Sequence, residues 1–350
     1  MSLPSVDAAP ASVLWYTRCP VPSPLGLAAR LGWLESEFQA LGLEVRSIID
    51  SPVTSVRESH FNHHLPWSFR QGGNIPPIWA RARGARTRLV GITWTDEFQA
   101  VITRRDSPLR QTAQLTGQRV GVPRRIHDAI DFHRATALKG LDSALGLAGL
   151  TLSEVQTVDL TITEPSLASP GDPSLHGLRR RHPYLAELQA LASGEVEAVF
   201  VKGAEGVLAA NLIGARVLAD LGSHPDPRVR INNGTPRLLT VDQALADERP
   251  DLVLQLLRLV RRAGAWAASH PDETLRFVAR EIQASEETVL ASNGPQLHAH
   301  LDLQLRPDWL DAIGYFKDFL RRQGVLEGDF EVADWVDAGP LRALQAESAS

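Results

Sequence analysis

The only cysteine of this 350-residue chain stands where a reactive thiol could meet a ligand. Cys19 follows an apolar run at residues 13–16 that predicts a first β-strand, and Pro20 and Pro22 come just after it. Because proline fixes φ and lacks a backbone N–H, neither strand nor helix continues through this point. The thiol is therefore expected on a rigid turn at the carboxyl end of a strand, where open α/β sheets bind ligands. The alternative is an inert cysteine packed as a small apolar side chain.

Three of the eleven histidines lie close together, at His60, His63 and His64. This spacing would place them on one helix face, but Pro66 follows at once and no carboxylate or cysteine has recognisable ligand spacing, so we predict no metal site. A thiol paired with an imidazole is the better use, because the imidazole lowers the thiol pKa and carries a proton. We take His60 as the candidate partner, since it and Cys19 each lie just beyond the end of a predicted strand.

The stretch Arg70-Gln71-Gly72-Gly73 predicts an anion site. The Arg70 guanidinium could hold two oxygens of a carboxylate, sulfinate or sulfonate. Gly72 and Gly73 would let a ligand approach the backbone closely. A helix is predicted to start at Ile75-Pro76-Pro77, and its N-terminus would add unpaired N–H groups and a positive dipole end. The alternative for Arg70 is a salt bridge at the surface.

The elements that must position these residues form an α/β pattern. A helix over residues 25–41 and a strand over 43–49 make a β-α-β start, which implies parallel strands with a right-handed crossover. Residues 51–73 are expected to be irregular, and strands are expected over 87–94 and 98–103. A second α/β unit then has predicted helices over 109–115, 128–147 and 184–192, strands over 119–122, 155–160, 198–201 and 216–220, and a loop over 161–182.

A strand over 237–241 and helices over 249–269, 272–282, 286–291 and 307–323 are predicted to close the chain. We therefore predict two lobes, the first from residues 12–105 plus 223–350 and the second from residues 106–222. Two crossings would join them and leave a ligand cleft between the lobes. The stretch Asn232-Asn233-Gly234 predicts a turn near the return crossing, which either faces the cleft or is a plain turn.

Composition limits the function classes. The net charge is −5, without a basic block, which argues against general nucleic-acid binding. One cysteine excludes an internal disulfide, and no apolar run approaches 18 residues, so no membrane span is expected. Residues 1–11 lack the basic start and apolar run of a signal peptide. We expect a cytoplasmic monomer without a membrane or nucleic-acid partner.

These motifs resemble the hydroxybiphenyl sulfinate desulfinase family. The resemblance rests on Cys19-Pro20-Val21-Pro22, on His60-Phe61, and on the run from Arg70-Gln71-Gly72-Gly73 to Asn74-Ile75-Pro76-Pro77. It is dense over roughly the first 125 residues and thin afterwards. The wider group is the type II periplasmic-binding-protein superfamily, whose members bind sulfonate, nitrate or thiamine precursors, and the Leu115-Thr116-Gly117-Gln118-Arg119-Val120-Gly121-Val122 block is similar to that whole group.

The resemblance implies a type II periplasmic-binding-protein-like fold and a hydrolase that cleaves the carbon–sulfur bond of an organic, aryl sulfinate to release sulfite, without a cofactor. It implies that Cys19 cleaves the bond, that His60 pairs with the cysteine, that Arg70 orients the sulfinate and that Gly73 donates a backbone N–H. Two mechanisms stay open: the thiolate attacks sulfur, or the thiol protonates the ring carbon.

The chain also departs from the family. Arg124 in the run after Val122, and Lys202 at the end of a second-lobe strand, make these segments more basic than the family pattern. They would favour a second negative charge or a more polar ligand, unless they are solvated surface cations. Trp15, with Trp67, Phe69 and Trp79, would line an aromatic pocket or pack in the core.

Two other functions fit the same fold. The first is a solute-binding protein for a sulfonate-like anion that works with a transporter, against which the missing signal peptide counts. The second is a cytosolic enzyme of the thiamine-precursor type, a family that uses a cysteine-rich iron motif and pyridoxal phosphate. A chain with one cysteine argues against that iron site.

Overall fold

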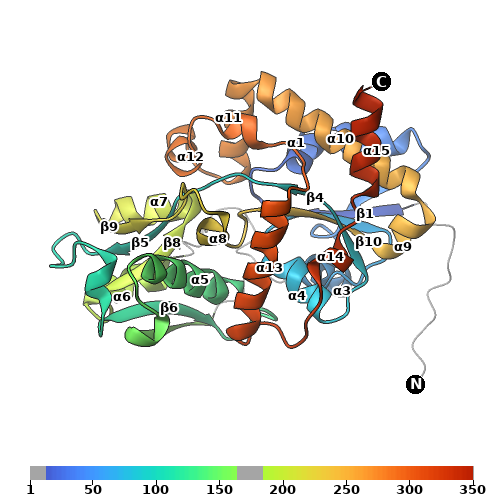
Figure 1. The fold of residues 1–350 in the computed structure, drawn as a ribbon. Helices are drawn as coiled ribbons and strands as arrows, with labels where there is room; N and C mark the ends of the chain where they lie inside the picture. Colours follow the sequence, from blue (N-terminus) through green and yellow to red (C-terminus); the bar gives the residue numbers. More distant parts are fainter. Residues whose placement is uncertain (1–12, 164–183, 350) are drawn as a thin grey trace.

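The described residues form two mixed α/β units, each built on a five-stranded sheet (Figure 1). The structure is a computed structural model, and it describes residues 13–163 and 184–349. The N-terminal segment 1–11 and most of the predicted loop over 161–182 lie outside the described residues. The chain passes from the first sheet to the second between residues 93 and 99, and returns between residues 220 and 237.

The first sheet carries the predicted chemistry. Its strands, in spatial order, are β2 (Glu44–Ser47), β1 (Val13–Arg18), β3 (Ser68–Gly72), β10 (Arg237–Asp242) and β4 (Thr87–Thr93). Strand β1 is parallel to both β2 and β3, whereas β10 is antiparallel to β3 and β4. Because β1 and β3 are parallel neighbours, their carboxyl ends meet at one edge of the sheet.

The second sheet follows the same plan. Its strands, in spatial order, are β7 (Gln156–Ile162), β6 (Arg119–Arg125), β8 (Ala198–Lys202), β5 (Gln99–Thr103) and β9 (Arg216–Asp220). Strand β6 is parallel to β7 and β8, and β5 is antiparallel to β8 and β9. In each sheet, therefore, the strand that follows a crossing lies antiparallel between its two neighbours. This strand is β10 in the first sheet and β5 in the second.

Helices surround both sheets and close the chain. Those before β5 or after β10 are α1 (Pro24–Arg30), α2 (Trp33–Gln39), α3 (Thr54–Asn62), α4 (Ile75–Ala82), α9 (Gln243–Glu248), α10 (Pro250–Ser269), α11 (Pro271–Glu281), α12 (Glu286–Asn293), α13 (Pro307–Arg322), α14 (Val332–Trp335) and α15 (Gly339–Ala349). Those between β5 and β10 are α5 (Phe132–Leu147), α6 (Leu185–Ser193), α7 (Gly203–Leu212) and α8 (Pro227–Arg230). Short 3-10 turns lie at Thr112–Leu115, Leu152–Glu154 and Leu297–His300.

Three local predictions are wrong. The helix over 25–41 is two helices, because Gly32 between them has a φ of 71° that ends the first. The expected helix over 109–115 is only the short 3-10 turn at Thr112–Leu115. Residues 51–73 are not irregular, since they contain helix α3 and strand β3.

The hydrophobic pattern of the sequence does not predict strand β3, because the strand is fully buried but carries polar side chains. All five of its residues, Ser68–Gly72, are buried, although Ser68, Arg70 and Gln71 carry polar side chains. Those side chains find partners within the fold: Gln71 accepts from the Leu25 N–H at 2.9 Å and donates to Thr93 at 3.1 Å. A central strand can therefore hold polar groups when neighbouring elements satisfy them.

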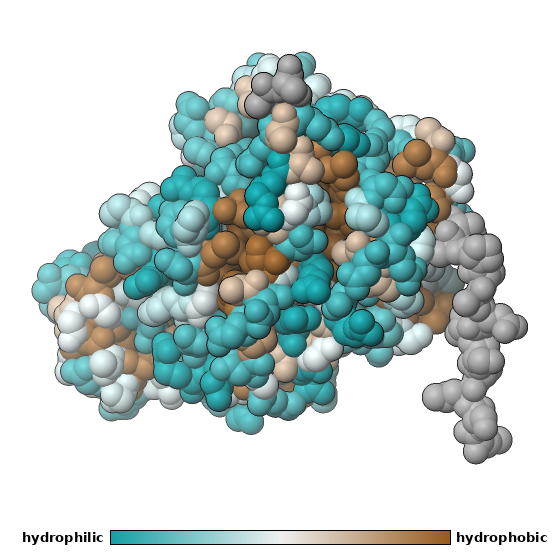
Figure 2. All heavy atoms as spheres, turned by 45° about the vertical axis from the view of Figure 1, so that its right-hand side comes forward, coloured by the Kyte–Doolittle hydropathy of each residue, from teal (hydrophilic) through white to brown (hydrophobic). Residues whose placement is uncertain are grey.

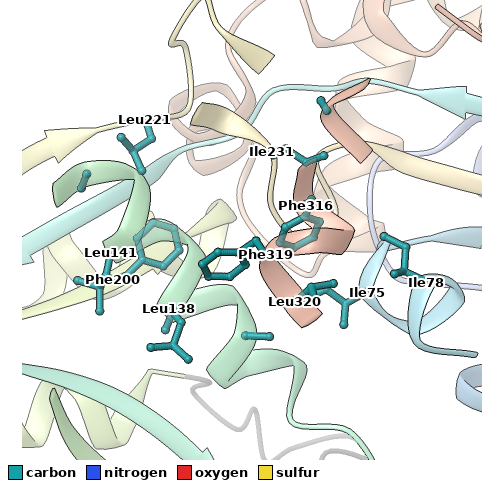
Figure 3. Packing of buried hydrophobic residues seen from close by; sticks show 14 of the residues in the cluster. Ile75, Ile78, Leu138, Leu141, Phe200, Leu221, Ile231, Phe316, Phe319 and Leu320 are labelled. Atoms are coloured by element: carbon teal, nitrogen blue, oxygen red, sulfur yellow. The ribbon is translucent and has the colours of Figure 1, made fainter. Parts of the chain in front are cut away.

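One of three buried apolar clusters in the described part of the chain contains residues of both units. Helix α13 contributes Phe316, Phe319 and Leu320, and Figure 3 shows them between α4, with Ile75 and Ile78, and the second unit. There they lie near Leu138 and Leu141 of α5. On the face shown in Figure 2, hydrophilic residues cover most of the surface, and apolar residues gather in separate patches. Among the described helices, none has the length and apolar content that a membrane span requires.

Candidate active site

Cys19 and Arg70 meet at the shared edge of β1 and β3. The register pairs Thr17 with Arg70, and the Cys19 N–H donates to the Gln71 carbonyl at 3.2 Å. The next backbone bond, from Val21 N–H to the Cys19 carbonyl at 2.8 Å, closes the turn that the prolines predict. The half-buried thiol is thus held at the end of a strand, as the sequence indicates.

Arg70 is 2% exposed, and its guanidinium is aimed at the cysteine. Its Nη2 donates to the Cys19 sulfur at 3.3 Å, and its Nη1 donates to the Gly73 carbonyl at 2.8 Å. No carboxylate among the described residues forms an ion pair with it, so the alternative of a surface salt bridge is not seen there. A buried cation beside a thiol stabilises the thiolate.

His60 reaches the cysteine from helix α3. Its Nε2 lies 4.0 Å from the Cys19 sulfur, and its Nδ1 lies 2.6 Å from the Thr17 hydroxyl oxygen. The hydroxyl can donate to the ring or accept from it, so both imidazole tautomers are compatible with this contact. His60 can therefore either accept a proton from the thiol or return one to a nearby atom.

The neighbouring histidines do not extend this pair into a metal cluster. The helix ends at Asn62, and His63 follows with a φ of 53°, so the predicted common face is broken. His64 is exposed and bonds to Asn62. Burial lowers the pKa of His63 well below its ordinary value, and the charges of Arg70 and His60 add to the effect. Within residues 13–163 and 184–349, no group of three or more His, Cys, Asp or Glu side chains could hold a metal ion.

A small cavity adjoins Arg70. Its volume is about 10 Å³, and Arg70 and His63 both line it. The Arg70 Nε and the His63 Nε2 are buried without a hydrogen-bond partner in the described part of the chain. Of the two terminal nitrogens, Nη2 donates to the Cys19 sulfur and Nη1 to the Gly73 carbonyl.

Both glycines after Gln71 are required by space, since neither has a positive φ. A methyl group added at Gly72 would collide with the Cys19 sulfur. One added at Gly73 would collide with the side-chain oxygen of Asn233, which arrives from the return crossing. The two glycines thus let the thiol and a second side chain approach the strand end closely.

The surroundings of Cys19 favour its thiolate. Burial raises the pKa of the thiol, but the Arg70 charge lowers it, as do the hydrogen bond and charge of His60 and the N–H of Gly73. Together they bring the pKa from 9.0 down to about 6. At neutral pH the anion is then the main form, and thiolates are the reactive form of cysteine.

Three other predicted binding residues have partners other than the thiol: Trp15, Arg124 and Lys202. Trp15 lies on β1 four residues before Cys19, and its ring contacts Arg46, whose Cζ is 6.0 Å from the ring centroid. Arg124 forms an ion pair with Asp159 on the neighbouring strand at 3.1 Å. Lys202 forms one with Glu97 at 2.7 Å. Neither cation is a free positive charge, because each has a carboxylate partner.

The aromatic residues beside His60 are not the tryptophans and Phe69 of the expected pocket. Phe69 is buried in the core against Phe38. The aromatic neighbour of His60 is Phe61, with ring centroids 4.8 Å apart and edge-to-face. Phe61 in turn stacks on Phe132 of α5 at 6.3 Å, which joins the first unit to the second.

Four contributors were not predicted as site residues: Thr17, Phe132, Asn233 and Arg237. Thr17 carries no sequence signal beyond its place two residues before Cys19. Asn233 stands in a predicted turn, and only its contact with Gly73 shows that the turn reaches the site. The fourth, Arg237, is fully buried at the start of β10 and interacts electrostatically with Glu97 and Cys19.

Comparison with solved structures defines the class of protein. The chain superposes on the aliphatic sulphonate-binding protein SsuA of Escherichia coli with a TM-score of 0.65, at 17% identity over 94% of this chain and 92% of that one. It superposes on the desulfurisation enzyme DszB, a cysteine-to-serine mutant in complex with biphenyl-2-sulfinic acid, with a TM-score of 0.74 at 25% identity over 96% and 99% of the two chains. The predicted periplasmic-binding-protein-like fold is confirmed.

Comparison of sequences narrows the class. No protein-family model matches the chain. The 2'-hydroxybiphenyl-2-sulfinate desulfinases of Rhodococcus erythropolis and Rhodococcus qingshengii are each 30% identical to it over 355 residues, which cover 94% of this chain and 93% of each relative. The chain belongs to the 2'-hydroxybiphenyl-2-sulfinate desulfinase family, as its motifs indicate.

Proposed function

We propose that this chain is a sulfinate desulfinase, which cleaves the carbon–sulfur bond of an organic sulfinate and releases sulfite. One observation carries the proposal: the Cys19 sulfur is held at once by Arg70 and by His60, in a member of a desulfinase family. A sulfinate is a small anion that a guanidinium and backbone N–H groups recognise. The same groups keep the cysteine ionised next to where the anion binds.

In the nucleophilic route, the Cys19 thiolate attacks the sulfinate sulfur. A sulfur–sulfur bond forms as the carbon–sulfur bond breaks, and the ring carbon takes a proton that His60 supplies. The products are the arene and an enzyme S–SO2 anion. Water then adds to that sulfur, the cysteine leaves with a proton, and hydrogen sulfite is released.

In the proton-transfer route, the Cys19 thiol protonates the ring carbon and sulfur dioxide departs. Water converts it to hydrogen sulfite and a proton, and His60 helps to reprotonate the thiolate. A pKa of about 6 leaves both the thiolate and the thiol populated near neutral pH, so the protonation state of Cys19 is compatible with either route. Mass spectrometry of acid-quenched enzyme during turnover separates the routes, since only the first attaches SO2 to Cys19.

The substrate we propose is an aryl sulfinate. Its support is the activity of the desulfinase relatives and the edge-to-face pair of His60 and Phe61 beside the thiol. Arg124 and Lys202 give little reason to expect a second negative charge, since each is balanced by a carboxylate. An aromatic ring lying near Phe61 would gain contact area without a polar cost.

The test measures sulfite released from 2'-hydroxybiphenyl-2-sulfinate, biphenyl-2-sulfinate and an alkyl sulfinate. Wild-type protein should release sulfite from at least one aryl substrate, and Cys19→Ser should lower the rate by roughly 10³-fold or more while its unfolding midpoint stays the same. If the wild type releases no sulfite from any of them, the proposal is wrong.

The second candidate function is binding of a sulfonate-like anion, which the SsuA-like fold favours. Such a binding protein would hold the anion through Arg70 and Gly73, but it would have no use for an ionised thiol. Under that function, calorimetry should find tight sulfonate binding that Cys19→Ser leaves intact, together with no turnover. Loss of sulfite release in Cys19→Ser would decide for the enzyme.

A further inference from the structure

We propose that Asn233 is a substrate-binding residue, whose Nδ2 amide donates a hydrogen bond to a sulfinate oxygen; this inference rests on the proposed function. Asn233 belongs to the return crossing between the two sheets, far along the chain from the thiol. Its side chain nevertheless lies against Gly73, where a methyl group would stand 3.2 Å from its Nδ2 and collide with its Oδ1.

The turn that carries Asn233 is held rigidly. Asn232 and Thr235 exchange two backbone hydrogen bonds, at 2.8 and 3.0 Å. The Asn232 side chain donates to the Thr136 carbonyl of α5 at 3.1 Å. The backbone carbonyl of Asn232 accepts from the Asn74 side chain at 2.9 Å. The turn is therefore bonded to both units, so the position of the next residue is set by the fold.

The orientation of the Asn233 amide is also set. Its Oδ1 accepts from the Ile75 N–H, the first of helix α4, at 3.3 Å. An amide whose oxygen meets a backbone donor must turn its NH2 group the other way. In the described part of the chain this Nδ2 donates no hydrogen bond, and the residue is half-buried, so the NH2 group is left to donate to a ligand.

The surroundings suit an anionic acceptor. Gly73, which touches Asn233, also bonds through its N–H to Cys19. On the other side of Asn233, Gly234 lies near Glu97 and Lys202, whose charges balance each other. A sulfinate has two oxygens that only accept hydrogen bonds. Arg70 and the Gly73 N–H provide charged and backbone donors, and Asn233 adds a neutral donor beside Gly73.

Two substitutions at this position separate a donor from a structural cap. Asn233→Asp keeps the oxygen that accepts from Ile75 but replaces the NH2 group with a second oxygen. Asn233→Ala removes both. If Asn233 donates to the sulfinate, Asp should be worse than Ala, because a carboxylate repels the anion. If Asn233 only caps α4, Ala should be worse than Asp.

We expect kcat/KM for biphenyl-2-sulfinate to fall about 10- to 100-fold in Asn233→Ala, and roughly tenfold further in Asn233→Asp. Asn211→Asp, on the exposed end of α7, makes the same charge change away from the site and should stay within twofold of wild type. In Asn233→Ala the pH midpoint of Cys19 alkylation by iodoacetamide should not move.

Three results would overturn the inference: unchanged kinetics in both variants, a smaller loss for Asp than for Ala, or a displaced alkylation midpoint in Asn233→Ala. The proposed function is tested separately, by sulfite release from the wild type. Calorimetry with biphenyl-2-sulfinate on Cys19→Ser, with and without Asn233→Asp, measures the hydrogen bond even in a protein that does not turn over. Equal affinities there would contradict the role of Asn233.

Discussion

Two cations of this protein, Arg70 and Lys202, have opposite surroundings. Both are largely buried, Arg70 within β3 and Lys202 at the end of β8. Lys202 pairs with Glu97 at 2.7 Å, and Thr235 of the return crossing donates to the same carboxylate oxygen at 2.8 Å. Arg70 contacts a thiol and a backbone carbonyl, with no carboxylate partner in the described residues. One charge is cancelled within the fold, and the other is left to act on its neighbours.

The difference separates a structural role from a functional one. The Lys202 pair ties β8 to the crossing that contains Glu97, and its net charge is near zero. The uncancelled charge of Arg70 lowers the pKa of Cys19 and would bind an anion as well. A buried cation without a carboxylate is costly to fold, so its presence beside a perturbed thiol indicates a site for chemistry.

The largest effect should come from removing the uncancelled charge. Arg70→Met should lower sulfite release by about 10²- to 10³-fold, because it removes an anion contact and the main cause of the lowered thiol pKa. The alkylation midpoint of Cys19 should rise well above pH 6. Arg83→Met, directly after the end of α4, removes an exposed ion pair and is the matched control. A midpoint still near pH 6 in Arg70→Met would contradict the comparison.

A smaller loss should follow from moving the sulfur instead of the charge. Gly72→Ala places a methyl group where the Cys19 sulfur lies, so we expect sulfite release to fall roughly 10²-fold. Gly146→Ala in α5 has open space around it and should leave activity unchanged. Kinetic assays of both variants, with unfolding curves, measure the effect. Full activity in Gly72→Ala would show that the thiol position is not critical.

The pH dependence should follow the ionised thiol. A lowered pKa means that the folded protein favours the anion, so the alkylation rate should reach half its maximum at about pH 6 and fall as pH decreases below that. His60→Gln removes one cause of the lowering, so its midpoint should move to higher pH. The reagent should be uncharged, such as iodoacetamide. An unchanged midpoint in His60→Gln would separate His60 from the ionisation of Cys19.

Substitutions of the two cations that pair with carboxylates, Lys202 and Arg124, should affect catalysis least. Lys202→Met removes the ion-pair partner of buried Glu97, so the free energy of unfolding should fall by about 1–3 kcal/mol, measured by urea denaturation. Its kcat should change much less than that of Arg70→Met. Arg124→Gln, whose side chain is 58% exposed, should change stability by less than about 1 kcal/mol and activity not at all. A catalytic loss in Lys202→Met as large as in Arg70→Met would abolish the distinction.

Much of the fold follows from local pattern. The parallel β1–α–β2 start, the strands of the second sheet and helices α5, α10 and α13 carry clear periodicity or buried-strand runs. Helix α3 and strand β3 do not, since polar side chains fill both, and α7 was also not predicted. These elements are stabilised by what packs on them, which a single stretch of sequence does not contain.

The sequence by itself determined where the thiol is and what stands next to the anion site. Pro20 and Pro22 stop the strand at Cys19, and Arg70, Gly72 and Gly73 are neighbours in the chain, so their proximity needs no tertiary contact. Backbone rules over a few residues are enough to predict such features.

Only the tertiary structure decided the rest. His60 is 41 residues from Cys19, Glu97 is 105 from Lys202, and Asn233 is 158 from Ile75. Whether a cation is cancelled or left free depends on which carboxylate packs beside it, and packing joins segments that share no local pattern. For this reason the sequence predicted Arg70, Arg124 and Lys202 alike as anion-binding residues, and the fold left only Arg70 beside the thiol without a carboxylate.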